Sequence, residues 1–245
     1  MLVTESVLCV RCLGTFSFGA GRAWNSGPAF KRGREFLEYL VSYPRAAASR
    51  EVLVGAFWPA LDAESALHRL HLAAAGARAA LRALSPELDG IRCNGGAYAW
   101  RPGIVIDSDV ELLLGASRGT SIADMERAAA SYSGEFLAGE EAEWMYPLRV
   151  RCANAYAIIL ERLAEDQARR AQWGAALEYA LRLVETDRAH EGATRLAMRA
   201  LGAMGRRGAA LAVYDALAAY LQRHLMLQPS AETCALRGAI IAGDA

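Results

Sequence analysis

The longest regular pattern of apolar positions in the chain lies between residues 62 and 84. The apolar side chains recur at steps of three and four: Leu67, Leu70, Ala74, Ala77, Leu81 and Leu84. At about 100° per residue they form one stripe, which predicts an amphipathic helix packed against a core, with Asp62 as its N-cap. The opposite face contains few hydrogen-bond donors and consists of Ser65, His68, Leu72, Ala75, Gly76, Ala79 and Ala83.

Shorter patterns surround this helix. Residues 7–13 and 15–18 alternate as two strands, and residues 31–42 have helical spacing up to Pro44. Ser49 is a candidate N-cap for a helix that ends before Pro59, and Asn94-Gly95-Gly96 predicts a hairpin between residues 90–93 and 97–100. The order of strands, two helices, long helix and hairpin predicts a winged helix-turn-helix over residues 1–105. In that architecture the third helix enters the major groove of DNA and the wing contacts the backbone.

The rest of the chain shows helical spacing alone. After Pro102-Gly103, a second unit begins with residues 107–114, and Gly174-Ala175-Ala176-Leu177 recurs as Gly208-Ala209-Ala210-Leu211. The offset, from 174 to 208, is the tetratricopeptide period of about 34 residues. We therefore predict an all-α repeat domain over residues 106–245, and an α+β protein overall. Stacked helix pairs of this kind usually serve as interaction surfaces.

Charge is unevenly distributed along the 245 residues, although the formal net charge is zero. Residues 1–105 hold 12 Lys and Arg against 8 Asp and Glu, a net of +4, and the remainder holds 15 against 19, a net of −4. The first half is therefore compatible with nucleic-acid binding. Without a long apolar run, a signal peptide or an even cysteine framework, we expect a cytoplasmic protein in a reducing compartment.

Two pairs of potential metal ligands are too incomplete to predict a metal site. Cys9 and Cys12 have CxxC spacing, but residues three apart on a strand point to opposite faces. His68 and His71 converge on one helix without a third ligand at a clear spacing, so we expect surface or DNA-backbone contacts from them.

No pattern predicts catalysis. Glu140, Glu141 and Glu143 cluster before Trp144, where a solvated loop in front of a buried Trp is the simpler interpretation. Phosphate-binding and nucleophile-elbow motifs are absent from the sequence. We expect neither an enzyme nor a cofactor.

Six arginines lie near the predicted DNA-reading elements, and each could contact phosphate or be an ordinary solvated charge: Arg50, Arg69, Arg78, Arg82, Arg92 and Arg101. Arg69 is the strongest candidate because it lies beside the outward face of the long helix.

Two sets of short segments are informative when taken in order. The first set, within residues 1–105, is Leu13-Gly14-Thr15-Phe16, residues 34–40, Ala48-Ser49-Arg50-Glu51-Val52-Leu53, Phe57-Trp58-Pro59, and Ile91 with Tyr98. The second set, within residues 106–245, is Tyr132-Ser133-Gly134-Glu135-Phe136-Leu137, Trp144, Arg149, Tyr214, Pro229-Ser230, Glu232-Thr233 and Leu236. Together they resemble the SARP-type transcriptional regulators, in which a winged helix, similar to the first set, precedes a bacterial transcriptional activator domain, similar to the second.

The resemblance implies promoter DNA binding through the long helix, and contacts with RNA polymerase or another protein, or a homodimer, through the helical repeats. Some members carry a further ATPase module, and we expect a minimal regulator. The sequence departs from the family in the long helix, where Gly76 and Ala79 occupy positions that tend to hold Arg and Leu67 replaces a polar residue. Arg78 is retained.

Two hypotheses follow. The first is a DNA-binding transcriptional regulator, with activation as the expected direction, whose DNA-binding residues are Arg50, Ser65, His68, Arg69, His71, Arg78 and Arg92. The second is an interaction scaffold whose winged helix has lost DNA reading and whose long helix contacts protein through Leu72, Ala75, Gly76 and Ala79.

Overall fold

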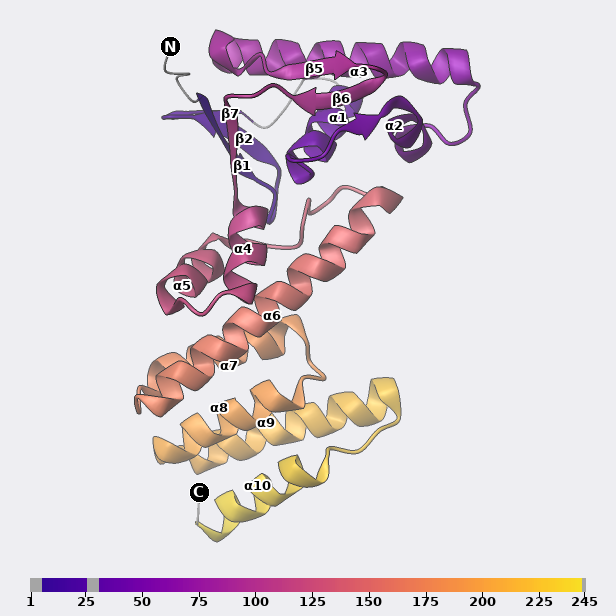
Figure 1. The fold of residues 1–245 in the computed structure, drawn as a ribbon. Coiled ribbons are helices and arrows are strands. Elements are labelled where there is room, and N and C mark those ends of the chain that lie inside the picture. The colour runs from indigo at the N-terminus through magenta and orange to yellow at the C-terminus, as the bar shows by residue number, and fades with distance from the viewer. Residues whose placement is uncertain (1–5, 26–30, 244–245) are drawn as a thin grey trace. The chain divides into compact units, whose positions relative to one another are not determined.

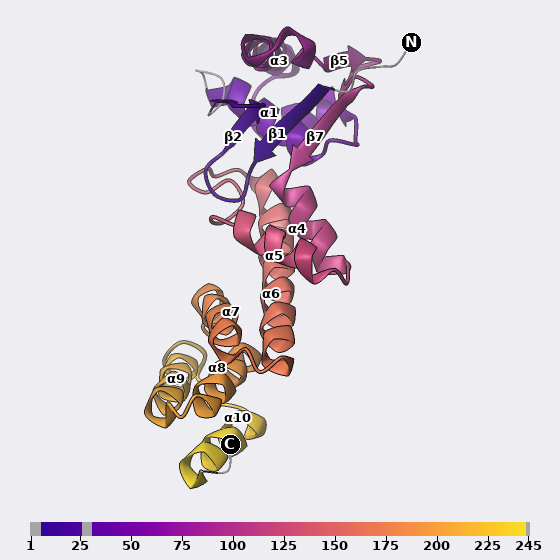
Figure 2. The same cartoon turned by 90° about the vertical axis from the view of Figure 1, so that its left-hand side faces the viewer.

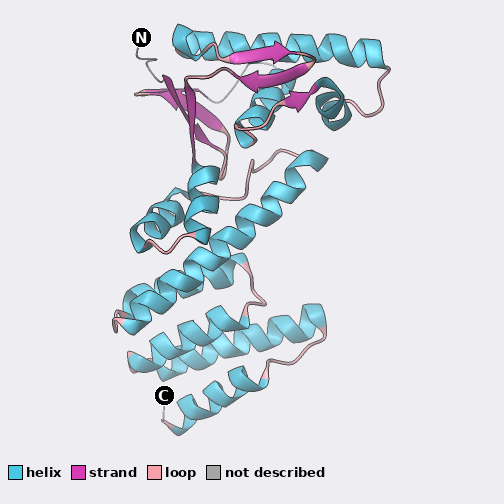
Figure 3. Cartoon of the chain, in the orientation of Figure 1, coloured by secondary structure: helices cyan, strands magenta, loops and turns pink. Residues whose placement is uncertain are grey.

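The computed structural model describes residues 6–25 and 31–243 (Figure 1). The chain divides into two compact units. Unit 1 comprises residues 1–115 and 130–153, and unit 2 comprises residues 116–129 and 154–245. Strands and helices are both present up to residue 108 and helices alone follow, which confirms the α+β class (Figure 3). Within the described residues, no helix combines the length and the apolar character needed to cross a membrane.

One sheet of unit 1 has the strand order β3-β2-β1-β7. Its strands are β1 (Ser6–Arg11), β2 (Ser17–Ala20), β3 (Ala23–Asn25) and β7 (Ile104–Ser108). β1 pairs antiparallel with β2, with Val10 opposite Phe18, and parallel with β7, with Leu8 opposite Ile106. The expected strand pair is confirmed with shifted ends. The expectation of helical spacing alone from residue 107 is wrong at its start, because Asp107 and Ser108 extend β7 and the helix begins at Asp109.

Three helices and a second sheet complete the winged helix-turn-helix. The helices are α1 (Lys31–Ser42), α2 (Arg50–Phe57) and α3 (Ala63–Leu84), followed by a short turn, η1 (Pro86–Leu88). The sheet has the order β4-β6-β5, with β4 (Ala48–Ser49), β5 (Ile91–Asn94) and β6 (Ala97–Trp100). Both predicted caps are present: Ser49 accepts a hydrogen bond from the Val52 amide and Asp62 accepts one from the Ser65 amide.

The buried stripe of α3 is made mainly of alanine. Its fully buried members are Ala66, Leu70, Ala73, Ala74, Ala77 and Leu81. Leu67 and Leu84, which we expected in this stripe, lie at its margin and are half-buried. Small side chains at the centre let α3 pack closely against α1, which lies beneath it in Figure 2.

Segments far apart in the sequence meet inside unit 1. Leu13 forms an isolated antiparallel bridge with Phe136, the Gly14 amide donates to the Glu135 carbonyl, and the Leu137 amide donates to the Cys12 carbonyl. Gly14 has a φ of +108°, and a Cβ there would collide with the Ser133 hydroxyl, so a larger residue would disrupt this pairing. The Leu13–Phe16 and Tyr132–Leu137 motifs noted in the sequence are therefore two sides of one contact.

Helices make up the remaining elements. They are α4 (Asp109–Arg118), α5 (Ile122–Ser131), η2 (Glu143–Met145), α6 (Tyr146–Arg169), α7 (Trp173–Thr186), α8 (Glu191–Ala203), α9 (Arg207–Tyr220), the π-helical turn η3 (Leu221–Leu225) and α10 (Ala231–Ala242). Gly174 and Gly208 are each the second residue of a helix, α7 and α9, as the repeat predicts. α8 packs against both α7 and α9, which confirms the tetratricopeptide-like stacking.

Candidate nucleic-acid interface

The exposed side of α3 carries the polar residues that we expected to read DNA. Ser65, His68, Arg69 and His71 are all solvent-exposed and lie in its N-terminal half. This is the half of a recognition helix whose side chains touch base edges in the major groove. The structure therefore brings four of the expected residues onto one accessible stretch of helix.

Arg69 is an exposed cation on this surface. Its side chain is exposed and makes no ion pair or hydrogen bond with any residue of the described chain. The helix start nearby is acidic, since Asp62 caps α3 and Glu64 lies in its first turn. Hydrogen bonds donated by Ser65 lower the pKa of Asp62 below its usual value, so this carboxylate stays charged at neutral pH. A phosphate would therefore favour the region of Arg69 over the N-terminus itself.

The wing presents a second polar surface. Gly95 and Gly96 have φ values of +55° and +83°, the left-handed pair that a two-residue hairpin turn requires. Along β5, Ile91 is buried, whereas Arg92 and Asn94 are exposed. Arg92, like Arg69, has no partner within the described residues. Asn94 was not among our expected residues, although the period-two alternation of β5 places it on the same face as Arg92.

Comparison with known proteins then identifies the family. The model of a family described as the bacterial transcriptional activator domain matches residues 112–241. The chain belongs to this family. A winged helix-turn-helix followed by this domain is the organisation of a SARP-type transcriptional regulator, the family suggested by the sequence.

A solved structure has a similar fold over nearly the whole regulator. It is Mycobacterium tuberculosis EmbR in complex with a low-affinity phosphopeptide, with a TM-score of 0.77 and 14% sequence identity. The similarity covers 98% of this chain and 66% of the EmbR chain, just under two thirds. At this identity the likeness establishes the fold. No curated protein sequence matches the regulator at a significant level.

Two expected DNA-binding arginines of the regulator instead make contacts within unit 1. The Arg78 Nε donates to the Ile91 carbonyl at 3.0 Å, and its guanidinium lies 5.9 Å from the centre of the Tyr98 ring. The Arg50 Nη2 lies 3.6 Å from the Cys93 sulfur. Both arginines are half-buried and join a helix to the wing.

Arg82 and Arg101 also bind partners within unit 1. Arg82 forms an ion pair with Asp89 at 3.3 Å, and Arg101 Nη2 donates to the Glu87 carbonyl at 2.6 Å. Of the six arginines near the reading elements, Arg69 and Arg92 are therefore the two with no partner among the described residues.

An apolar strip follows the polar residues along the same side of α3. Leu72 is 53% exposed, Ala75 and Ala79 are exposed, and Gly76 is half-buried. These are the four residues that we expected at a protein interface. The two hypothetical functions of α3 thus occupy successive segments of one face, with the donors nearer its N-terminus.

The remaining candidate residues, the potential metal ligands and the glutamate cluster, are described by their structural surroundings. Within the described chain, no three His, Cys, Asp or Glu side chains gather as a metal site would require. Burial raises the pKa of Cys12 well above its usual value, which leaves an unreactive thiol. Glu141 and Glu143 are exposed, as the solvated-loop interpretation expects, whereas the half-buried Glu140 pairs through its carboxylate with Arg34 at 3.1 Å and Lys31 at 3.8 Å. Trp144 is half-buried and packs 5.0 Å from the Tyr39 ring.

Proposed function

We propose that this transcriptional regulator binds duplex DNA through the N-terminal half of α3 and through its wing. The observation that carries the proposal is the exposed run of Ser65, His68, Arg69 and His71 on the helix that occupies the recognition position. Arg69 and Arg92 supply phosphate contacts from neighbouring elements, since both are exposed cations with no partner in the described chain. Ser65 and the two imidazoles can exchange hydrogen bonds with base edges.

The contacts of Arg50 and Arg78 refine the expected DNA-binding set. Because Arg78 holds β5 against α3, we propose that it orients the wing for binding, and Arg50 supports the same hairpin. Any phosphate contact by these two would use the guanidinium nitrogens that remain after those bonds.

Fluorescence anisotropy with a labelled 30-base-pair duplex, first selected from a random pool, tests the proposal. Affinity should fall steeply as salt rises from about 50 to about 200 mM, because each phosphate contact releases counterions. Arg69→Ala and Arg92→Ala should each weaken binding and reduce the salt slope by about 1. Arg199→Ala, which removes an exposed arginine from α8, is the matched control and should leave the slope unchanged. Absence of duplex binding at about 50 mM salt would sink the proposal.

We further propose that unit 2 supplies the contact with RNA polymerase or another protein through which the regulator activates transcription. Support comes from three consecutive apolar side chains that unit 2 leaves exposed, with Leu225 at 47%, Met226 at 77% and Leu227 at 55%. Met226→Asp should reduce transcription from a target promoter in a purified system and leave anisotropy unchanged. Full transcription with this variant would count against the contact.

The apolar strip of α3 supports a second candidate, an interaction scaffold or homodimer formed through Leu72, Ala75, Gly76 and Ala79. Leu72→Glu places a charge at the centre of the strip and should dissociate a dimer or complex without unfolding the chain. Sedimentation velocity measures this directly. If the wild type is monomeric and Leu72→Glu changes only DNA affinity, the strip belongs to the DNA interface and the scaffold hypothesis fails.

A further inference from the structure

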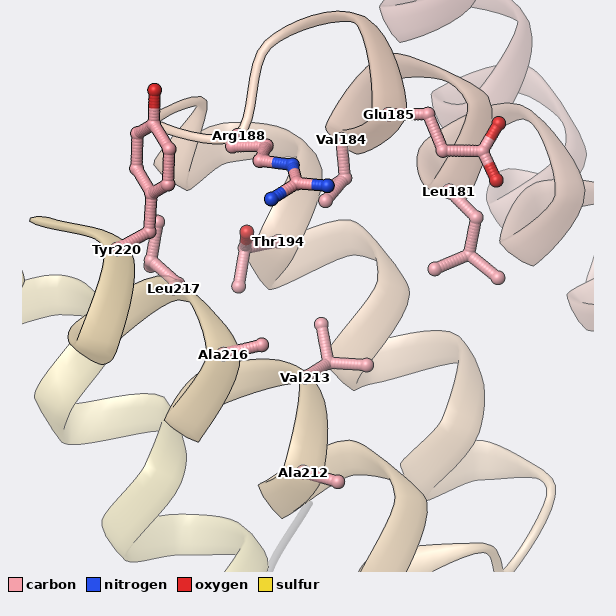
Figure 4. A pocket seen from close by; sticks show the side chains of 10 residues that line it. All are labelled: Leu181, Val184, Glu185, Arg188, Thr194, Ala212, Val213, Ala216, Leu217 and Tyr220. Atoms are coloured by element: carbon pink, nitrogen blue, oxygen red, sulfur yellow. The ribbon is translucent and has the colours of Figure 1, made fainter.

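Unit 2 contains a pocket that the proposed DNA and protein contacts do not use. Its volume is about 640 Å³, within the range of about 300–1,000 Å³ that small-molecule sites occupy. Its lining residues come from α7, α8, α9 and the turn after α7, so the whole pocket lies within the stacked repeats (Figure 4).

The walls of this pocket are mainly apolar. Leu181 and Val184 of α7 and Val213, Ala216 and Leu217 of α9 contribute aliphatic side chains, as Figure 4 shows. Neighbouring repeats in such arrays bury their apolar faces against each other. Here the faces of α7 and α9 leave apolar side chains lining an open volume, which suits a ligand with an apolar body.

Thr194 places an unsatisfied hydroxyl in the wall. The residue is 1% exposed, and its Oγ1 atom has no hydrogen-bond partner among the described residues. Buried polar groups in native proteins nearly always have a partner. In Figure 4 the hydroxyl points toward the side of the pocket where Arg188 lies. A ligand acceptor atom at this wall would satisfy the hydroxyl.

Arg188 adds an unpaired positive charge to the rim. Its side chain is exposed and forms no ion pair or hydrogen bond within the described chain. Glu185, one turn earlier, also lines the pocket, but its carboxylate points away from Arg188 in Figure 4. A single guanidinium matches one carboxylate through two parallel hydrogen bonds. The nearby Glu185 would repel a ligand that carried a higher negative charge.

We propose that this pocket binds a small amphipathic carboxylate, with the apolar body among α7 and α9 and the carboxylate between Arg188 and the Thr194 hydroxyl. Such a ligand would bridge α7, α8 and α9 and stabilise their stacking. This gives the regulator a site for a chemical signal in the domain that we propose for partner contacts. The site is separate from α3, so its test needs no DNA.

Isothermal titration calorimetry of the full chain with dodecanoate tests the proposal. We expect a dissociation constant on the order of tens of micromolar, and binding of dodecan-1-ol at least about tenfold weaker because it lacks the charge. Sedimentation velocity with and without dodecanoate should show the same oligomeric state. No binding of dodecanoate up to about 1 mM would overturn the proposal.

Three variants locate the ligand. Arg188→Gln should weaken dodecanoate about tenfold or more and abolish the preference over dodecan-1-ol, whereas Arg199→Gln on the same unit should have no effect. Thr194→Val keeps the side-chain shape and should weaken binding about threefold to tenfold. Ala216→Phe should block the pocket, and Ala219→Phe, also exposed on α9 but outside the lining, is its control.

Equal affinities for Arg188→Gln and Arg199→Gln, or for Ala216→Phe and Ala219→Phe, would place dodecanoate elsewhere and overturn the proposal. A wild-type dimer that Ala216→Phe converts to a monomer would also overturn it, because the pocket would then hold a second copy of the chain.

Discussion

The long-range hydrogen bonds within unit 1 join residues that are farther apart in the sequence than those within unit 2. In unit 1 the Asp109 carboxylate accepts hydrogen bonds from the Cys12 and Leu13 amides, across 97 and 96 residues. Among the described residues of unit 2, side-chain hydrogen bonds between helices span shorter distances along the chain, such as the bond from Arg182 to the Ala129 carbonyl across 53 residues. Its Ala164, Ala180 and Ala197 cluster likewise joins successive helices. We expect damage to spread through unit 1 and to stay local in unit 2, as in other repeat arrays.

Loss of the Asp109 carboxylate is expected to have the largest effect. Asp109→Ala would leave two buried amides without an acceptor, 2.9 and 3.0 Å from the oxygens that they now bond. Since each unsatisfied buried group costs about 1–3 kcal/mol, unfolding of unit 1 should become easier by about 3 kcal/mol or more. Urea unfolding followed by hydrogen-exchange mass spectrometry assigns the loss to peptides of unit 1.

Asp107→Ala is the matched control for this change. Asp107 is an exposed residue of the same strand region, and its removal should change stability by less than about 0.5 kcal/mol. If Asp109→Ala unfolded peptides near residue 109 alone and left those around residues 8–18 protected, unit 1 would not be the cooperative body that its long-range bonds indicate.

The second prediction concerns pH and Glu38 of α1. Burial raises the pKa of Glu38 to about 7, against the lowering effect of Arg34, whose Nε donates to Oε1 at 2.8 Å. Because the folded pKa lies above the unfolded one, Glu38 favours folding at low pH, and this contribution is lost between about pH 4.5 and 7. A shift of this size corresponds to about 3 kcal/mol.

Glu38→Gln should therefore flatten the dependence of unit 1 stability on pH across that window, measured by urea unfolding at pH 5 and pH 8. Glu35→Gln, which replaces another buried carboxylate of α1, is the control, and its stability should still fall between pH 5 and pH 8. An unchanged fall in Glu38→Gln would assign the pH dependence to another group.

Local features could be predicted from the sequence because their causes lie within a few residues. The caps at Ser49 and Asp62, the Asn94-Gly95-Gly96 turn and the bounds of α1 follow from adjacent side chains and backbone preferences. The repeat is visible in the sequence because each helix pair packs on its neighbour, so that Gly174 and Gly208 occupy equivalent positions.

Long-range features could not be predicted in the same way. Residues 104–108 form a strand because β1 lies beside them, and Ala48 and Ser49 form one because β6 does. The same limit applies to the proposed DNA-binding residues. No local pattern distinguishes Arg78, which bonds to β5, from Arg69, which has no partner in the part of the chain that the structure describes. The exposure of the four polar residues of α3, Ser65, His68, Arg69 and His71, could be predicted because helical periodicity determines which face is outward.

A third prediction tests whether damage to unit 2 stays local. The Glu191 carboxylate at the start of α8 accepts bonds from the Ser230 amide at 2.9 Å and the Thr233 hydroxyl at 2.6 Å, which attach α10. Burial raises the pKa of Glu191, but these bonds outweigh it and lower the pKa below its usual value. The contribution is therefore present at neutral pH and is lost in acid as the folded group becomes protonated.

Glu191→Ala should weaken the docking of α10 by about 1 kcal/mol. Hydrogen exchange should rise in residues 231–242 and remain unchanged in α7. Glu185→Ala, an exposed acid of α7, is the control and should not affect α10. Equal loss of protection across all unit 2 helices would show that this unit, too, unfolds as one body.

The smallest expected effect is a gain in stability at two helical glycines, one in each unit. Gly238 lies inside α10 and Gly55 inside α2, and a Cβ at either position would meet no atom within 4 Å. Replacement by Ala should stabilise each helix by up to about 1 kcal/mol, because Ala loses less backbone entropy on folding. The change at Gly55 should raise the urea midpoint of all unit 1 peptides together, whereas the change at Gly238 should slow exchange within α10 alone. If Gly238→Ala slowed hydrogen exchange equally in all unit 2 helices, unit 2 would unfold as cooperatively as unit 1, because stabilising α10 would then stabilise every helix before it.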